Sequence, residues 1–169
     1  MSTPPLRHPE WFPEFYVAPV YPNVETVLQT LWTRLLSSGV NVVDYLDESY
    51  VGRLQDGESF LRIARTSGHI NGDQLRDQAR VQTAALTASR ADSQELIAFV
   101  RDMYETANHG GLYVDGALIR ETGEVVGPQV IPEQIRESRL VPVTHDIYLG
   151  ASNKQLADTY PQALRDYLA

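Results

Sequence analysis

The sequence contains no cysteine, a single lysine and no long hydrophobic run. Without cysteine the chain can form neither disulfides nor thiolate metal sites, so packing alone must hold the fold together. No apolar stretch approaches the roughly 20 residues that a membrane span needs. The opening residues, MSTPPLRHPEW, lack the apolar stretch of a signal peptide. We therefore expect a soluble protein with no membrane partner, made and used in the cytoplasm or assembled there.

Basic residues are too few and too scattered for a protein that binds duplex DNA. The chain has 22 Asp and Glu against 14 Lys and Arg, and its formal charge is −8. Binding to duplex DNA depends on clustered Lys and Arg that neutralise phosphates. The composition therefore argues against a duplex-DNA binder.

Motifs that carry chemistry are also missing. There is no HExxH, no GxSxG, no P-loop and no GxGxxG after a strand. The acidic stretch 44–58 lacks the alternation of a calcium loop, so we interpret it as a solvated acidic face rather than a cation site. His145 falls among alternating apolar residues, where a packed, hydrogen-bonded side chain is favoured over a metal ligand. We assign no catalytic, cofactor-binding or metal-binding residue and expect no cofactor, although a dispersed catalytic triad stays open.

Length and composition indicate one domain with two tails. With 169 residues, of which 43% are hydrophobic, the chain can bury one core. We expect an extended arm at 1–22, an α+β domain at 23–150, and a weakly helical tail at 151–169 interrupted by Pro161. The arm holds six prolines and five aromatics, which are Trp11, Phe12, Phe15, Tyr16 and Tyr21. Either the arm folds back over its own domain, or some of its rings dock on a neighbouring subunit.

Hydrophobic periodicity predicts the order helix, strand, strand, strand, helix, strand, strand. Asn23 is a suitable N-cap for the first helix, which Gly39 should close, and Ser89 should cap the second helix. The strands are expected at 40–46, 59–66, from 79 onward, 123–132 and 139–150. This pattern predicts two helices packed on one face of a mostly antiparallel four- to five-stranded sheet. The expected core comprises Leu28, Leu31, Leu35, Leu61, Ile63, Leu96, Val100, Met103, Val143 and Ile147.

A polar connection of about ten residues is expected between two of the strands. Turn-forming residues favour a loop over 69–78, which is longer than most hairpin loops. Long loops on rigid scaffolds often carry recognition, and simple variation in length is the alternative. Apolar residues within this polar loop would gain from a partner that removes them from water. The candidate interface residues are Trp11, Phe12 and Tyr16 of the arm and His69, Ile70, Gln74, Leu75 and Arg76 of the loop.

Two stretches of the sequence resemble a known family. The run FLRIARTSG, a loop, and then DQARVQTAALTASRADSQELIAFVRDMY is similar to the tail terminator proteins of long-tailed, siphovirus-type bacteriophages, particularly those of actinobacterial hosts. In that family an acidic patch opens a helix of the L-A-x-x-V-R type, which corresponds here to Leu96–Arg101. The later GPQVIPEQIRESRLVPVTHDIYL resembles the closing strands of the family. The likeness covers roughly residues 24–150 and leaves the arm and the last residues outside it.

The resemblance implies a structural protein rather than an enzyme. Tail terminators form a hexameric ring that caps the tail tube, ends its polymerisation and joins the tail to the head. The implied partners are further copies of the chain, the major tail protein of the tube and the head–tail connector proteins, with DNA only passing through the lumen. The implied location is the tail–neck junction of the virion, after assembly in the host cytoplasm. A head–tail connector or other neck protein, and a small cytoplasmic enzyme or binding domain, are the alternatives.

Overall fold

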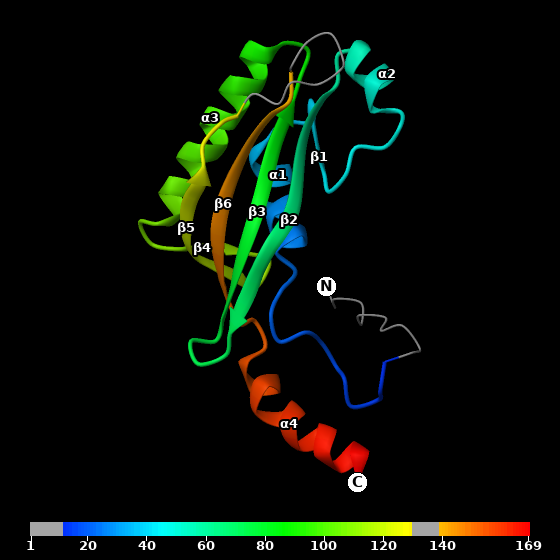
Figure 1. Cartoon of the computed structure of the whole chain (residues 1–169), viewed down its shortest axis with the longest axis vertical. Helices are drawn as coiled ribbons and strands as arrows, with labels where there is room; N and C mark the ends of the chain where they lie inside the picture. The colour runs from blue at the N-terminus through cyan, green and yellow to red at the C-terminus, as the bar shows by residue number, and fades with distance from the viewer. Residues whose placement is uncertain (1–11, 130–138) are drawn as a thin grey trace.

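A computed structural model of the chain describes residues 12–129 and 139–169 (Figure 1). Within these ranges the fold is α+β, with four helices and one six-stranded sheet. The elements in chain order are α1 (Val24–Leu35), β1 (Val40–Val43), α2 (Tyr50–Gln55), β2 (Ser59–Asn71), β3 (Arg76–Leu86), α3 (Arg90–Ala107), β4 (Leu112–Val114), β5 (Ala117–Val126), β6 (Val141–Gly150) and α4 (Lys154–Leu168).

The sheet is mixed and, as predicted, mostly antiparallel. Its strand order is β1-β2-β3-β6-β5-β4, and every neighbouring pair is antiparallel except β1 and β2, which run parallel. A parallel pair needs a crossover connection, and α2 lies in the connection between β1 and β2. The prediction of four to five strands was wrong, because β4, with three residues, is too short to show a clear period. The six-residue α2 was missed for the same reason.

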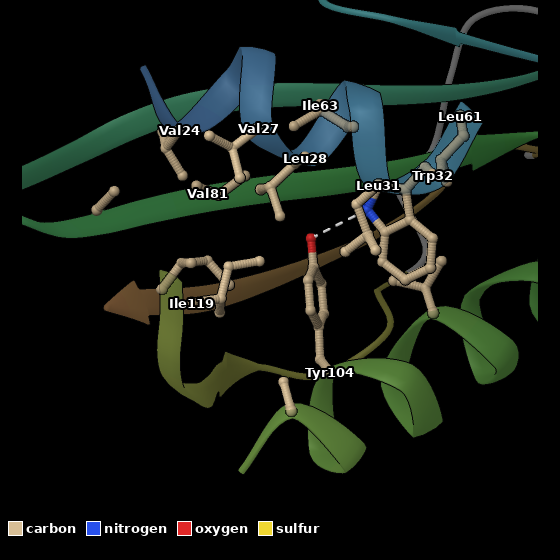
Figure 2. Packing of buried hydrophobic residues seen from close by; sticks show 14 of the residues in the cluster. Val24, Val27, Leu28, Leu31, Trp32, Leu61, Ile63, Val81, Tyr104 and Ile119 are labelled. Atoms are coloured by element: carbon tan, nitrogen blue, oxygen red, sulfur yellow. Dashed lines mark hydrogen bonds between the residues drawn. The ribbon is translucent and has the colours of Figure 1, made fainter. Parts of the chain in front are cut away.

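Helices α1 and α3 cover one face of the sheet and enclose the main core. Figure 2 shows α1 and α3 facing each other across this core, with the indole Nε1 of Trp32 donating to the hydroxyl of Tyr104 at 3.4 Å. The predicted arrangement of two helices on one face holds for these two. The short α2 lies against the opposite face, where its Tyr50 and Leu54 pack on Phe60 and Leu86. A second, smaller core therefore exists that the sequence analysis did not predict.

Most of the predicted core residues are buried, and one is not. Leu28, Leu31, Leu61, Ile63, Val100, Val143 and Ile147 are buried in the main cluster, and Leu96 and Met103 are partly buried against it. Leu35 is 46% exposed, because it lies in the last turn of α1. The prediction for Leu35 was wrong.

Both predicted N-caps are confirmed. The side chain of Asn23 accepts from the backbone N–H of Glu25, and that of Ser89 accepts from the N–H of Asp92. The predicted ends were less accurate, since α1 stops at Leu35, before Gly39. Helix α4 continues through Pro161, so the expected interruption is absent there. The strand expected at 123–132 begins earlier, at Ala117, and its positions beyond 129 lie outside the described residues.

The predicted loop at 69–78 is largely strand. Strand β2 extends to Asn71 and β3 begins at Arg76, so four residues form the turn. The polar side chains near the turn favoured a loop, but strand pairing depends on the backbone. The residues before the turn pair with those after it from His69↔Gln78 to Asn71↔Arg76, and β6 extends the pairing on the far side of β3.

Candidate interaction surfaces

The tip of the β2–β3 hairpin carries most of the predicted loop residues. Ile70 is 56% exposed, and His69 and Gln74 are also exposed. The side chain of Asn71 accepts from the N–H of Gln74 at 3.1 Å, and Leu75 has a positive φ of 47°. The tip is thus a hydrogen-bonded turn that presents an apolar side chain to solvent.

A partly buried ion pair links the two strands of the hairpin below its tip. The Arg65 guanidinium donates to both carboxylate oxygens of Asp77, at 2.7 and 2.8 Å, and Asp77 is 2% exposed. Bidentate arginine–carboxylate pairs fix geometry as well as supply energy. A β-bulge lies between Arg65 and Ser67, next to this pair. Ile70 therefore lies on a paired strand rather than in an unpaired loop.

The described part of the arm packs on α4. The ring of Tyr16 stacks on that of Tyr160, with 5.5 Å between centroids, and Phe15 meets Tyr160 and Tyr167 edge-on. The Tyr160 hydroxyl accepts from the N–H groups of Val17 and Ala18 and donates to the carbonyl of Ala18. These contacts agree with the alternative in which the arm folds back, although it folds onto α4 rather than over the sheet (Figure 1).

Three consecutive backbone groups join the hairpin tip to the arm. The N–H of Ala151 donates to the carbonyl of Leu75, and the N–H groups of Ser152 and Asn153 both donate to the carbonyl of Val20. Residues 151–153 connect β6 to α4, so the tip, the arm and the start of α4 meet at one end of the sheet. We call this region, comprising residues 12–22, 69–76 and 151–168, the junction end (Figure 1).

The structure thus brings the two predicted groups of interface residues to the same end of the molecule. Phe12 and Tyr16 lie on the arm, with their ring centroids 4.7 Å apart. Trp11 lies outside the described residues. The sequence analysis missed Tyr160 and Tyr167, which complete the aromatic cluster. Their seven-residue spacing on a helix could have indicated them, but Pro161 argued against a continuous helix there.

Helix α4 leaves much of its apolar surface exposed. None of its residues is buried within the described part of the chain. Leu164, Tyr167 and Leu168 are 49%, 65% and 72% exposed. A cavity of about 600 Å³ lies between the arm and the end of this helix, lined by Phe12, Phe15 and Tyr167 among others. Exposed aromatic residues beside a hollow are typical of protein-binding surfaces.

A second cavity, between α3 and the β5–β6 strands, is polar. It has a volume of about 370 Å³ and is lined by Arg101, Glu124 and His145 among others. Arg101 binds Glu124 at 2.5 Å, and the Nε2 of buried His145 lies 3.8 Å from the same carboxylate. Burial lowers the pKa of His145, and the negative charge of Glu124 opposes this effect. His145 is packed as expected, but its Nδ1 has no hydrogen-bond partner among the described residues.

This cavity does not assemble a recognisable reaction centre. No group of three or more His, Asp or Glu side chains that could hold a metal ion occurs within residues 12–129 and 139–169. Over the same residues, no helix is long and apolar enough to cross a membrane. The surfaces that stand out are instead the apolar ones at the junction end.

Among the described residues, five of the ten exposed large hydrophobic side chains lie at the junction end, and such a surface is typical of the class of proteins that bind other proteins. The family model described as phage tail termination protein matches residues 20–155. The chain therefore belongs to the phage tail termination protein family, and it is a structural, tail-terminating component of the virion. This membership implies a protein that is not an enzyme. None of the curated proteins compared with the chain matches it.

Proposed function

We propose that the protein forms a ring of six copies that caps the tail tube, stops its polymerisation and joins the tail to the head. The observation that carries the proposal is the match of residues 20–155 to the tail termination family. The proposal also includes a long, flexible tail and an actinobacterial host. Its partners are the major tail protein and the head–tail connector proteins.

The junction end is the surface that we assign to contacts with the tube or a neighbouring copy. It gathers Ile70 of the hairpin and the exposed apolar residues of α4, tied together through residues 151–153. Aromatic and apolar side chains gain most where a partner removes them from water. Within the same proposal, Trp11, Phe12 and Tyr16 reach the neighbour or the head side, while His69, Gln74, Leu75 and Arg76 surround Ile70.

A ring built from this chain would be strongly acidic. Six copies at −8 each would carry a formal charge of −48. If part of this charge lines the lumen, it repels passing DNA and keeps the DNA from adhering. Heterologous contacts that close by rotation would generate such a ring.

Native mass spectrometry of the protein, alone and bound to tail tubes, tests the ring. The expected result is a mass of six chains with no bound metal or nucleotide, together with sixfold symmetry in a view along the particle axis. A phage lacking the protein should make tails of uncontrolled length that do not join heads. Twelvefold symmetry, with tails of normal length in the deletion, would contradict tail capping and favour a head–tail connector.

A further inference from the structure

The sheet has one face that α1 and α3 leave open. Figure 1 looks onto this face, with α1 behind the strands. Strand alternation and register place the side chains of Arg76, Gln78 and Arg80 on the open face of β3, and those of Asp146 and Tyr148 on the open face of β6. Because α2 covers only the end of this face near Phe60, the half toward the hairpin has no covering element among the described residues.

Arginines gather on this uncovered half. Arg76 lies over the ring of Tyr148, with its guanidinium carbon 5.5 Å from the centroid. The Nε of Arg120 lies 3.2 Å from the position that a Cβ on Gly150 would take, and Gly150 pairs with Arg76. We call Arg76, Arg80 and Arg120, with Tyr148 among them, the arginine face.

The arginine face is positive although the whole chain is negative. Arg80 is neutralised by Asp146, whose carboxylate it binds at 2.8 and 3.0 Å. Glu121, paired with Tyr148 in the register, is a further acid on this face. Arg76 and Arg120 outnumber it, so the face keeps an excess of positive charge in a chain of formal charge −8.

The opposite charge collects on the connection between β1 and β2. Residues 44–58, which we call the acidic segment, carry Asp44, Asp47, Glu48, Asp56 and Glu58. Arg53 binds Glu58 at 2.6 Å and neutralises that carboxylate. Asp44, Asp47, Glu48 and Asp56 are all exposed, and Tyr45 beside them is 69% exposed. The acidic segment thus offers four carboxylates and an aromatic ring to solvent.

We propose that the arginine face of one copy docks on the acidic segment of the next copy in the ring. This inference rests on the proposed function and adds the contacting surfaces to it. Copies that each carry −8 repel one another unless the surfaces in contact have opposite sign. The arginine face and the acidic segment lie on different parts of the molecule, as a head-to-tail interface requires. Arginine and tyrosine are also the residues that most often dominate interface energies.

Duplex DNA is the other polyanion that an arginine face could meet. The charges on this face favour a protein partner, because the positive excess is small and the face includes the carboxylates of Asp146 and Glu121. A phosphate backbone would be repelled by these carboxylates, whereas a protein surface can place its own charges between them. DNA binding is therefore one of the outcomes that the experiment must distinguish.

The test uses two variants that reverse charge on one surface each. The face variant carries Arg76→Glu and Arg120→Glu, which form no ion pair among residues 12–129 and 139–169. The segment variant carries Glu48→Lys and Asp56→Lys, both at exposed positions. The matched controls reverse the same charges at exposed positions outside the arginine face, the acidic segment and the junction end: Arg34→Glu with Arg90→Glu, and Glu95→Lys with Asp102→Lys.

Each variant alone should fail to assemble, and the two together should succeed. Like charges then meet in each homogeneous ring, and the hexamer fraction at about 0.15 M salt should fall at least about tenfold. In a mixture, the reversed face meets the reversed segment and the native face meets the native segment. Hexamers with equal numbers of the two variants should therefore return in native mass spectra, and tails of normal length should return in cells that make both.

The possible results separate this inference from the proposed function. If the wild-type protein forms no hexamer in solution or on tubes, the ring itself is wrong and the inference fails with it. If the wild type forms hexamers and both variants do so equally well, the proposal of a ring is supported, but the assignment of its contacting surfaces is wrong. The same conclusion follows if mixing the two variants restores no hexamers. Binding of a DNA duplex of about 20 base pairs that the face variant loses, with assembly unchanged, would assign the arginine face to DNA instead. Control variants that assemble normally exclude a general effect of charge.

Discussion

At the scale of single residues, the buried hydroxyl of Tyr104 has hydrogen-bond partners. The hydroxyl of Tyr104 meets both the indole of Trp32 and the hydroxyl of Thr83, at 3.4 and 3.2 Å. Burial raises the pKa of Tyr104, which keeps the hydroxyl protonated. A buried polar group is tolerated when its hydrogen bonds are made, so each such residue makes its local structure sensitive to substitution.

His145 should make stability depend on pH. Burial lowers its pKa below 6.5, with Arg101 adding to this effect and Glu124 opposing it. As the pH falls below 6.5 the unfolded chain takes up a proton before the folded chain does, so the stabilisation present at neutral pH is lost progressively. Urea unfolding between pH 7.5 and 5 should show a steeper loss for the wild type than for His145→Gln. If the free energy of unfolding falls equally with pH in both proteins, His145 is not the cause of the pH dependence.

Gly68 should not tolerate a side chain. Its φ is +129°, and a Cβ there would lie 2.2 Å from the carbonyl oxygen of Gln78. Gly68→Ala should therefore lower the free energy of unfolding by at least about 2 kcal/mol. Gly72→Ala is the control, because a Cβ there meets nothing within 4 Å, and it should cost no more than about 0.5 kcal/mol. Chemical denaturation measures the free energy of unfolding of both variants. Equal losses would show that the backbone near Gly68 shifts to accommodate the added Cβ.

At the scale of elements, the two ends of the chain are held in different ways. Helix α1 is anchored by a buried stripe that includes Val24, Leu28 and Trp32. Helix α4 has no buried residue among those described and is held by the arm and by residues 151–153. A helix of this length is marginal in water without tertiary contacts. The two helices should therefore respond differently to the loss of a single contact.

The same substitution at two positions of α1 separates burial from helix propensity. Leu28 is fully buried and Leu35 is 46% exposed. Leu28→Ala should cost about 2–5 kcal/mol because it leaves a cavity in the core. Leu35→Ala should cost less than about 1 kcal/mol. Urea denaturation gives both values, and similar losses would mean that the last turn of α1 is covered in solution.

The Tyr160 hydroxyl should be the main polar link between α4 and the arm. It makes three hydrogen bonds to the backbone of Val17 and Ala18. Tyr160→Phe removes all three, so the amides of these residues should exchange hydrogen faster while the stability of the sheet stays unchanged. Tyr113→Phe is the control, since Tyr113 is 73% exposed on β4. Unchanged exchange in the Tyr160 variant, measured by mass spectrometry, would show that ring stacking alone holds the arm.

At the scale of the whole molecule, the surfaces that we propose for assembly are separate from the core that holds the fold. The main core lies between the sheet and the α1–α3 pair, whereas five of the ten exposed large apolar side chains among the described residues lie at the junction end. A protein divided in this way can lose an assembly contact without losing its fold.

Ile70→Ser should therefore affect assembly and not stability. Ile70 is 56% exposed at the hairpin tip, so the substitution should shift the melting temperature very little. Tails should become variable in length or fail to join heads, as seen by electron microscopy of particles. Tyr113→Ser removes a still more exposed ring at the other edge of the sheet and should leave particles normal. If the Ile70 variant makes normal tails, the hairpin tip does not contact the tail tube.

Sequence by itself determined the features that depend on local spacing. The apolar period of α1 and α3, the caps at Asn23 and Ser89, and the alternation along β6 follow from the geometry of helices and strands. The sequence also carried the resemblance that the family match over residues 20–155 supports. These signals are local or depend on sequence order, so no contact between distant residues is needed to recognise them.

Only the tertiary structure decided the features that depend on distant contacts. The parallel pairing of β1 with β2, the extension of β2 to Asn71 and the continuous α4 depend on partners remote in sequence. The joining of Leu75 to Ala151 and of Val20 to Asn153 is likewise invisible in local patterns, because it consists of backbone hydrogen bonds. Backbone groups are the same in every residue, and only the folded chain determines which of them meet.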